Sequence, residues 1–456
     1  MTSAKKPQSD SRRGLSRRDF LTTTAAAGAG FWLTSPLRAA EPASKNGELH
    51  IAIIGAGTQG MVLMQNCLKI PGVRFVAVCD IWPYSQRYAS RRLKAYKQEV
   101  NVYEDYREML EKEKALDAVI VASPDWMHAE HAIACLQAGK HVYCEKEMSN
   151  SLEKAKQMVL TARQTGKLLQ IGHQRRSNPR YIFALEKIIR DAKLLGRITT
   201  GYGQWNRGKA DDRGWPKEYE LDKATLNKYG YDTMHQFCNW RWYRKYGGGP
   251  IEDLGSHQID IFNWFLDTPP KSVMASGGMD YYKGHEWYDN VMAIYEFDTP
   301  AGVVRAFYQV LTTTSARGYY ETFMGDEGTL QLSEDPRKCR VFAEGHLPLG
   351  AWDKWAKKGY LIKLPVEEQK PEAKGEMDAI TSVYKSPPQI GWLMPVEVEK
   401  SYHQAHLENF FDAVRGKGKL NCPPEVAYET AVTVLTVNDA VAAGKRIDFQ
   451  PEEFKV

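Results

Sequence analysis

The sequence predicts an α/β protein, with an amino-terminal doubly wound parallel sheet and a carboxy-terminal α+β region built on a large, mostly antiparallel sheet. Two patterns support this prediction. From residue 48 to 171, short apolar runs alternate with segments of helical periodicity, which is typical of parallel strands joined by helices. From residue 271 onward, runs such as 291–297, 302–310 and 328–332 alternate apolar and polar residues, which favours antiparallel strands.

The elements expected in the first region follow one another in a regular order. Strands are expected at residues 48–54, 74–79, 117–122, 141–144 and 168–171, and helices at residues 61–68, 126–138 and 150–165. Asn150 and Ser151 stand where the last helix should begin, and Gly139 and Gly166 stand where two helices should end.

The character of the sequence changes after Gly172. Residues 195–250 are rich in glycine, tryptophan and tyrosine, whereas residues 335–394 are rich in Lys, Glu and Pro and predict a surface excursion. Two later segments, 403–415 and 424–443, predict helices that pack back to close the fold. The expected domains are therefore a leader at 1–43, a first domain at 47–171, and a second domain at 172–456 for substrate binding and oligomerisation.

The leader has the composition of an export signal. Residues 16–21 (SRRDFL) form a twin-arginine pattern, an apolar run follows at 21–33, and small residues suitable for cleavage stand at 39–43. The apolar run is shorter than the roughly 20 residues that a membrane-spanning helix needs. The sequence therefore predicts twin-arginine export to the periplasm, with a membrane anchor as the outcome if the signal is retained.

Net charge argues against a nucleic-acid partner. The whole chain carries +5, but residues 1–43 hold seven basic and three acidic side chains, so only +1 remains beyond the leader. A basic surface for nucleic acid is therefore not expected. The seven cysteines are scattered without a CxxC pair, and Cys79 and Cys144 fall in buried strands, so no essential disulfide is predicted.

A glycine motif follows the first expected strand. Gly55, Gly57 and Gly60 form GxGxxG between a strand and a helix, and Asp80 stands 20 positions later at the end of the next strand. This context predicts a Rossmann dinucleotide site, with the pyrophosphate at the helix start and the ribose hydroxyls on Asp80. The charge of Asp80 favours NAD, while Arg87 and the Arg91–Arg92 pair leave NADP open.

Two longer segments resemble the Gfo/Idh/MocA family of sugar and cyclitol oxidoreductases. They are residues 117–148 (DAVIVASPDWMHAEHAIACLQAGKHVYCEKEM) and residues 247–266 (GGGPIEDLGSHQIDIFNWFL). The resemblance covers nearly all of the chain beyond the leader, and the leader is similar to that of periplasmic members such as the glucose–fructose oxidoreductases. The resemblance implies a nicotinamide-dependent oxidoreductase that acts on a carbohydrate or cyclitol, and a homodimer or homotetramer.

The resemblance also implies a catalytic group. Lys146 matches the lysine of the family's Glu-Lys-Pro motif, and Asp253 and His257 match its D-x-G-x-H pair. A histidine suits removal of a hydroxyl proton as hydride leaves carbon, and a nearby ammonium stabilises the developing alkoxide. Asp253 stands one helical turn before His257 and would orient its ring. A surface lysine and a buried structural Asp–His pair are the alternatives.

Position 147 departs from the family pattern, because it is Glu where the family has proline. A carboxylate there would pair with Lys146 or with substrate, which puts the geometry of the lysine in question. Asp253, His257 and Asp260 are also plausible metal ligands. No further His or Cys stands at close spacing, so no metal site is predicted.

The remaining candidate residues fall into two sets. The predicted cofactor contacts are Gly55, Gly57, Thr58, Gln59, Gly60, Asp80, Ser123, Pro124, His128, Glu145 and Lys146. The predicted substrate contacts are His173, Arg176, Trp240, Trp242 and His257. The resemblance implies that the segment 173–176 faces the substrate. The two tryptophans come from an aromatic-rich segment that also holds Trp205, and they are predicted contacts because aromatic faces stack on sugar C–H groups. For His128 and the tryptophans, a structural role is the alternative.

The leading hypothesis is hydride transfer from a sugar or cyclitol hydroxyl to a tightly held nicotinamide cofactor. Because a periplasm offers little free NAD, the cofactor would be loaded before export and regenerated in place. One alternative is a redox-neutral, NAD-dependent glycoside hydrolase or epimerase that works through a transient keto-sugar. A second alternative is a non-catalytic sugar-binding homologue.

Overall fold

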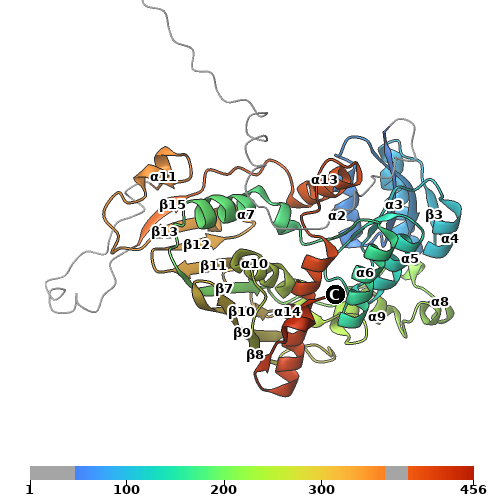
Figure 1. Cartoon of the computed structure of the whole chain (residues 1–456). Coiled ribbons are helices and arrows are strands. Elements are labelled where there is room, and N and C mark those ends of the chain that lie inside the picture. Colours follow the sequence, from blue (N-terminus) through green and yellow to red (C-terminus); the bar gives the residue numbers. More distant parts are fainter. Residues whose placement is uncertain (1–46, 365–388) are drawn as a thin grey trace, which may run out of the picture. The chain divides into compact units, whose positions relative to one another are not determined.

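The computed structural model describes residues 47–364 and 389–456, which build two sheets (Figure 1). The predicted leader at 1–43 lies outside the described residues, so its role as an export signal stays a prediction. Within the two described ranges, no helix combines the length and the hydropathy needed to cross a membrane.

The first sheet is parallel and six-stranded. Its strands are β1 (Leu49–Ile54), β2 (Val73–Cys79), β3 (Asn101–Tyr103), β4 (Ala118–Val121), β5 (His141–Cys144) and β6 (Leu169–Ile171). Their order is β3-β2-β1-β4-β5-β6, so the direction of winding reverses between β1 and β4. The predicted doubly wound sheet is confirmed, and this reversal is where such sheets open a ligand crevice.

Helices flank the parallel sheet, and local chemistry sets their ends. They are α2 (Thr58–Cys67), α3 (Pro83–Ala95), α4 (Tyr106–Lys112), α5 (Asp125–Gln137) and α6 (Leu152–Thr165). The Ser151 hydroxyl accepts the backbone N–H of Lys154 at the start of α6, and Gly166 ends that helix with a φ of 65°. The sequence did not predict β3, because only one of its three residues is buried and no apolar run marks it.

The second sheet has ten strands. They are β7 (Ile198–Asn206), β8 (Ser272–Gly278), β9 (Asn290–Thr299), β10 (Gly302–Leu311), β11 (Tyr319–Gly325), β12 (Gly328–Leu332), β13 (Arg340–Ala343), β14 (Ile362–Lys363), β15 (Ile390–Leu393) and β16 (Ile447–Asp448). Their order is β14-β15-β13-β12-β11-β7-β10-β9-β8-β16, and every pair except β7 with β10 is antiparallel. The predicted large, mostly antiparallel sheet is confirmed.

The prediction of a surface excursion at residues 335–394 was wrong at both ends of that segment. Strands β13, β14 and β15 all come from it and join the sheet, with Val341 and Trp392 packed in the core. Strands of two to four residues are too short to carry a visible alternation, so composition misled the prediction. Residues 365–388 lie outside the described part of the chain.

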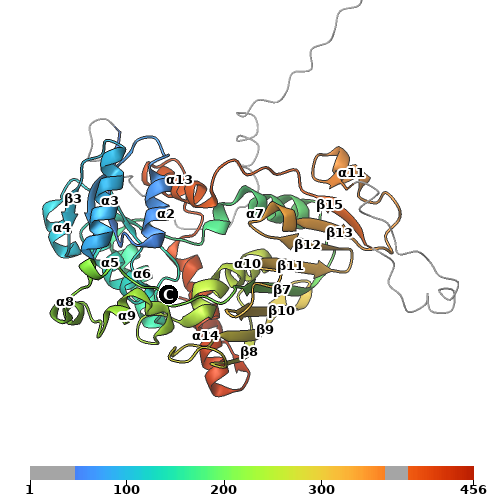
Figure 2. The ribbon, with the colours of Figure 1, turned by 180° about the vertical axis from the view of Figure 1, so that it is seen from behind.

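Long helices from the second domain pack on both sheets. α10 (Ser256–Leu266) and α14 (Pro424–Ala443) pack together and lie against the ten-stranded sheet (Figure 2). α14 also packs on α6, and α13 (Tyr402–Val414) packs on α2, so the end of the chain returns to the first domain. On the other face of the sheet Met274 and Ile294 are exposed, and the predicted homodimer or homotetramer stays a prediction.

Shorter elements link these parts. The α-helices are α7 (Pro179–Phe183), α8 (Lys223–Lys228), α9 (Met234–Cys238) and α11 (Asp353–Lys357), and the π-helical segments are η2 (Ala184–Asp191) and η5 (Ile251–Gly255). The 3₁₀ turns are η1 (Gln174–Ser177), η3 (Lys217–Tyr219), η4 (Trp240–Trp242), η6 (Pro336–Lys338) and η9 (Pro451–Phe454). The π-helical segment η5 runs directly into α10, and both ends of that junction carry candidate site residues.

Candidate active site and cofactor groove

A cavity of about 1260 Å³ lies at the carboxyl ends of β1, β2, β4 and β5. The loops that follow these strands form one side of its lining. Residues from the second domain, mainly from the segment 205–257 and from the start of α13, form the other side. The cavity therefore occupies the crevice that the strand order predicts for a doubly wound sheet.

The glycine loop closes tightly behind this cavity. A Cβ on Gly55 would lie 2.5 Å from the Ser123 backbone nitrogen, and a Cβ on Gly60 would lie 2.0 Å from the Gly55 carbonyl oxygen. Both positions therefore exclude any side chain. Gly57, the residue before α2, faces open space, so the backbone there can approach a bound phosphate at the positive end of the helix. These three positions fit a dinucleotide pyrophosphate.

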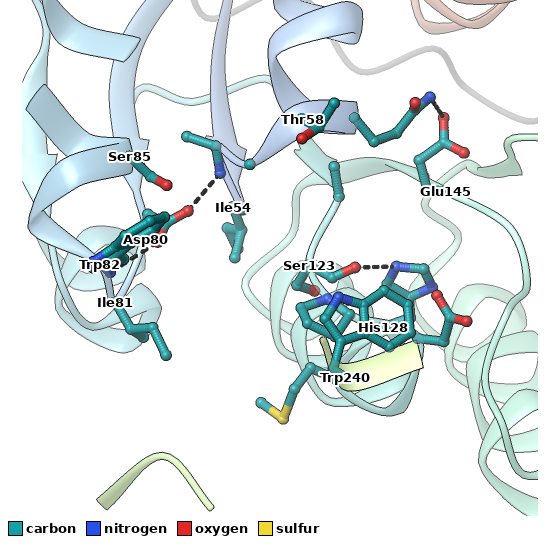
Figure 3. A pocket seen from close by; sticks show the side chains of 18 of the residues that line it. Ile54, Thr58, Asp80, Ile81, Trp82, Ser85, Ser123, His128, Glu145 and Trp240 are labelled. Carbon is teal, nitrogen blue, oxygen red and sulfur yellow. Dashed lines mark hydrogen bonds between the residues drawn. The ribbon is translucent and has the colours of Figure 1, made fainter. Parts of the chain in front are cut away.

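Asp80 closes the far end of the groove. Its carboxylate accepts the backbone N–H groups of Ala56 at 2.7 Å and Trp82 at 2.8 Å, as Figure 3 shows. Burial raises the pKa of Asp80 to about 6, although the two backbone N–H groups act to lower it. Arg87 was one of the residues that kept NADP possible as the cofactor. Its guanidinium N–H donates to the Tyr219 hydroxyl at 2.8 Å. The carboxylate is thus placed to accept hydrogen bonds from ribose hydroxyls, and its charge would repel a 2′-phosphate.

Replacing Asp80 by Asn tests this assignment. The variant keeps an oxygen for the Ala56 N–H but removes the charge, so the preference for NAD over NADP should fall by roughly tenfold to a hundredfold. Titration of each dinucleotide against the purified protein gives the ratio of the two dissociation constants. Asp298→Asn, a matched change at an exposed residue of β9 outside the cavity lining, serves as the control. An unchanged ratio in Asp80→Asn would contradict the role given to this carboxylate.

Lys146 and Asp253 meet at the other end of the groove. The Lys146 ammonium donates to the Asp253 carbonyl at 2.5 Å and lies 3.8 Å from its carboxylate. Arg241 also donates to that carboxylate at 3.1 Å, and Arg207 lies 3.9 Å from it. Burial alone would raise the pKa of Asp253, but Arg241, Lys146 and Arg207 together hold it well below its usual range. Asp253 is therefore an ionised anchor for Lys146.

His257 faces the same end of the cavity. Its ring stacks on Trp205 with centroids 5.3 Å apart, and its Nδ1 is buried without a hydrogen-bond partner. Burial, with the positive charges of Lys146 and Arg175, lowers the pKa of His257 well below the ordinary value. The imidazole is therefore neutral at physiological pH and able to accept a proton.

The expectation that Asp253 orients His257 was wrong. The carboxylate turns to Arg241 and Lys146, and no hydrogen bond joins it to the imidazole. The physical reason is η5, because its wider π-helical turn breaks the α-helical i,i+4 register on which that expectation rested.

Glu147, the departure from the family motif, lies behind the cavity and does not line it. Its carboxylate is fully buried and lies 3.1 Å from His173 Nε2, within ion-pair distance but without hydrogen-bond alignment. Burial acts to lower the pKa of His173, but the carboxylates of Asp260 and Glu147 outweigh it and raise that pKa. The peptide bond between Lys146 and Glu147 is cis. Glu147 therefore pairs with His173 rather than with Lys146 or substrate.

The structure brings most predicted site residues together. Those that line the cavity are Gly55, Gly57, Thr58, Gln59, Asp80, Ser123, Pro124, His128, Glu145, Lys146, Trp240, Asp253 and His257. Ser123, His128 and Glu145 lie in the same view as Asp80 in Figure 3. Both ring nitrogens of His128 lie within hydrogen-bond distance of backbone carbonyl oxygens, 2.6 Å from that of Glu147 and 2.7 Å from that of Ser123. This side chain therefore stabilises the loop that carries Lys146.

Three predicted substrate residues lie elsewhere. Arg176 is buried and binds both carboxylate oxygens of Asp260 at 2.7–3.0 Å. Trp242 stacks on His285 with centroids 4.3 Å apart, and His173 pairs with Glu147. Internal partners occupy these side chains, so the structure corrects the expectation that they contact substrate.

The substrate end of the cavity also holds residues outside the predicted set of substrate contacts. They are Gln174, Trp205, Arg207, Glu334, Tyr402 and His403. Buried Arg175 donates to Glu334 at 3.0 Å and to Glu321 at 3.1 Å, which fixes the Glu334 carboxylate at the cavity wall. The aromatic-rich segment around Trp205 and the implied segment 173–176 around Gln174 were signals in the sequence, whereas the other four residues reach the site through the fold.

Comparisons with known proteins agree with this geometry. Residues 49–173 match the model described as "Oxidoreductase family, NAD-binding Rossmann fold", and residues 184–331 match the GFO/IDH/MocA C-terminal domain. The 1,5-anhydro-D-fructose reductase of Ensifer adhaerens is 32% identical over 219 residues, which are 47% of this chain and 56% of the relative. The inositol 2-dehydrogenase of Rubrobacter xylanophilus is 25% identical over 62% of this chain and 71% of the relative.

The fold has a close counterpart among solved structures. The WlbA dehydrogenase of Bordetella pertussis, solved with NADH and UDP-GlcNAcA, superposes with a TM-score of 0.61 at 18% identity, over 88% of this chain and 99% of that one. The match to the Ensifer reductase spans only a little over half of that enzyme's length. Since two family models together cover most of the described residues, the chain belongs to the Gfo/Idh/MocA oxidoreductase family and carries that family's NAD-binding Rossmann domain.

Proposed function

We propose that the protein is an NAD-dependent oxidoreductase that removes hydride from the hydroxyl-bearing carbon of a sugar or cyclitol. The observation that carries this proposal is the convergence of Lys146, Asp253 and His257 at one end of the dinucleotide groove. The names of the relatives, a sugar reductase and an inositol dehydrogenase, support the same class of substrate.

The chemistry follows from the protonation states at this end. Bound NAD supplies the hydride acceptor. Lys146 directs its ammonium to the substrate oxygen and stabilises negative charge there as the C–H bond breaks. Because His257 Nδ1 is buried, Nε2 is the ring nitrogen that takes the hydroxyl proton. Asp253 holds Lys146 in place through its carbonyl and its carboxylate.

Substrate recognition falls to Trp205 and to Glu334, which line the cavity. The Trp205 ring stacks on His257 and on Tyr319, with centroids 5.3 and 4.5 Å apart, so these contacts fix its position. The part of the ring that lines the cavity is apolar and suits the C–H side of a sugar ring. The Glu334 carboxylate, fixed by Arg175, offers acceptors for ring hydroxyls.

Glu334→Gln tests this arrangement. The variant keeps the shape but loses the charge, so KM for the best substrate should rise by roughly tenfold with a smaller change in kcat. Steady-state or single-turnover kinetics separates the two parameters, and exposed Glu220→Gln is the control. An unchanged KM would remove Glu334 from the substrate site.

The assignment itself is tested by presenting a panel of sugars and cyclitols to the purified protein and following the nicotinamide absorbance in a single turnover. A keto-sugar formed in step with NADH supports the proposal. A cleaved or epimerised product with no net change in cofactor redox state would instead establish the redox-neutral alternative. Absence of any product together with tight sugar binding would favour a non-catalytic homologue.

We also propose that the protein works in the periplasm after twin-arginine export, with NAD loaded beforehand. The support is the SRRDFL pattern and the short apolar run behind it. Replacing Arg17 and Arg18 by lysine should leave the protein in the cytoplasm, as measured by cell fractionation. Equal export of the variant would contradict the route.

A further inference from the structure

A segment of the second domain crosses the cofactor groove. Strand β7 ends at Asn206, and residues 207–219, here called the strap, run from there to η3. At its far end the Tyr219 carbonyl accepts the Trp82 indole N–H at 2.7 Å, and its hydroxyl accepts the Arg87 guanidinium at 2.8 Å. Trp82 and Arg87 follow β2, so the strap is tied to the first domain beside Asp80.

The middle of the strap is tied to the second domain. The Arg213 backbone N–H donates to Asn239 Oδ1 at 2.7 Å, and Asn239 Nδ2 donates back to the Arg213 carbonyl at 3.1 Å. Two imidazoles hold Asp212: its carboxylate lies 2.9 Å from His235 Nε2 and 3.2 Å from His285 Nε2. We call the Asp212, His235 and His285 contacts the clasp.

One of the two imidazoles of the clasp is held rigidly by its surroundings. The His285 side chain is buried and stacks almost parallel on Trp242, with 9° between the planes. Burial acts to raise the pKa of Asp212, but the hydrogen bonds from His235 and His285 outweigh it and lower that pKa. Asp212 is therefore ionised and has two imidazole partners. An exposed residue of an ordinary loop does not need two such partners.

The clasp places the next residue over the glycine loop. The Arg213 guanidinium lies 3.4 Å from the Thr58 hydroxyl, on the first residue of α2, and both side chains line the cavity. Within the described residues the guanidinium forms no ion pair, and burial together with the positive charges of Arg241 and Arg207 lowers its pKa, although Asp253 acts to raise it. A cation without a close counter-charge therefore faces the helix start and the open side of Gly57, where a pyrophosphate binds.

We propose that the strap is a retaining device for NAD: Arg213 binds the pyrophosphate from the side opposite α2, and the clasp keeps the strap closed over the bound dinucleotide. NAD then leaves only when the contacts of Asp212 or Tyr219 open. The inference rests on the NAD site of the proposed function but not on the identity of the sugar. It assigns to the second domain a share of cofactor binding that the glycine motif alone does not supply.

The test measures cofactor release without any sugar. Full-length wild-type protein, Arg213→Ala and Asp212→Asn are loaded with NADH, and its fluorescence is followed after mixing with a large excess of NAD. Each variant should release NADH at least roughly tenfold faster than wild type, because each loses a charge-assisted contact. Arg213→Lys, which keeps the charge but not the forked geometry, should fall between them and wild type.

Matched controls stand on the strap itself. Lys209→Ala and Asp211→Asn change exposed charges next to the clasp and should release NADH within about twofold of the wild-type rate. Equal rates in wild type, Arg213→Ala and Asp212→Asn would overturn the proposal, and so would an equal acceleration in the controls. Because no sugar is present, a failure to find sugar turnover leaves this measurement intact, and the two proposals fail separately.

Discussion

Lys146→Met is expected to slow hydride transfer by at least roughly 10³-fold while leaving NAD bound. Methionine keeps the length of the side chain, but it carries no charge for the substrate oxygen. The Lys146 side chain is only 11% exposed, and Asp253 holds its ammonium at the edge of the cavity. Its charge also contributes to the low pKa of His257, which should rise in the variant.

Single-turnover reduction of bound NAD measures this effect, with NAD affinity determined separately. Lys156→Met changes an exposed lysine on α6 and should behave as wild type. Lys146→Arg should recover little, since the planar guanidinium spreads its charge and cannot keep the same bond to the Asp253 carbonyl. Near-normal hydride transfer in Lys146→Met would contradict the role proposed for the Lys146 ammonium.

Mild acid is expected to weaken the fold at three buried histidines. Burial lowers the pKa of His131 and His406 to about 3 and that of His141 to about 4, so these rings stay neutral in the folded protein. The unfolded chain binds protons on them below about pH 6.5, so stability falls as pH falls through that value. Asp80 acts in the opposite direction, because its folded pKa of about 6 lies above the unfolded one.

Each of the three histidines should contribute a loss of about 1.6 kcal/mol in the free energy of unfolding between pH 6.5 and 5, whereas Asp80 and Glu321, whose pKa burial raises to about 7, return part of this loss. Urea unfolding at the two pH values measures it. His131→Gln removes one of the three protons and should cut the loss by about 1.6 kcal/mol. The same pH dependence in His131→Gln and wild type would contradict the burial of this ring as a neutral group.

The parts of this site that the sequence predicts correctly are those set by local chemistry. Gly55 and Gly60 fall where a Cβ has no room, and Ser151 and Gly166 fall where a helix begins and ends. Each of these signals lies within a few residues of the feature it specifies, so one sequence is enough to read it. Asp80 belongs with them, because the end of an apolar run locates it.

The residues that the sequence misses or misplaces depend on distant partners. Glu334 reaches the cavity because buried Arg175 holds it, and Tyr402 and His403 reach it because α13 packs back on α2. Arg176 was expected to contact substrate, but it binds the carboxylate of Asp260, which lies 84 positions away in the sequence. A pattern along the chain cannot show which of several arginines finds an internal carboxylate, since that choice depends on the packing of two domains.

Among the seven thiols of the chain, one stands apart. Six are buried, whereas Cys238 is half-buried and lines the cavity beside the strap. Burial raises its pKa to about 11, so alkylation at neutral pH is slow, and the other six cysteines are at most 5% exposed. The molecule thus carries a native footprinting probe: maleimide labelling should report groove occupancy at a single position, with bound NAD protecting Cys238 and release of NAD exposing it.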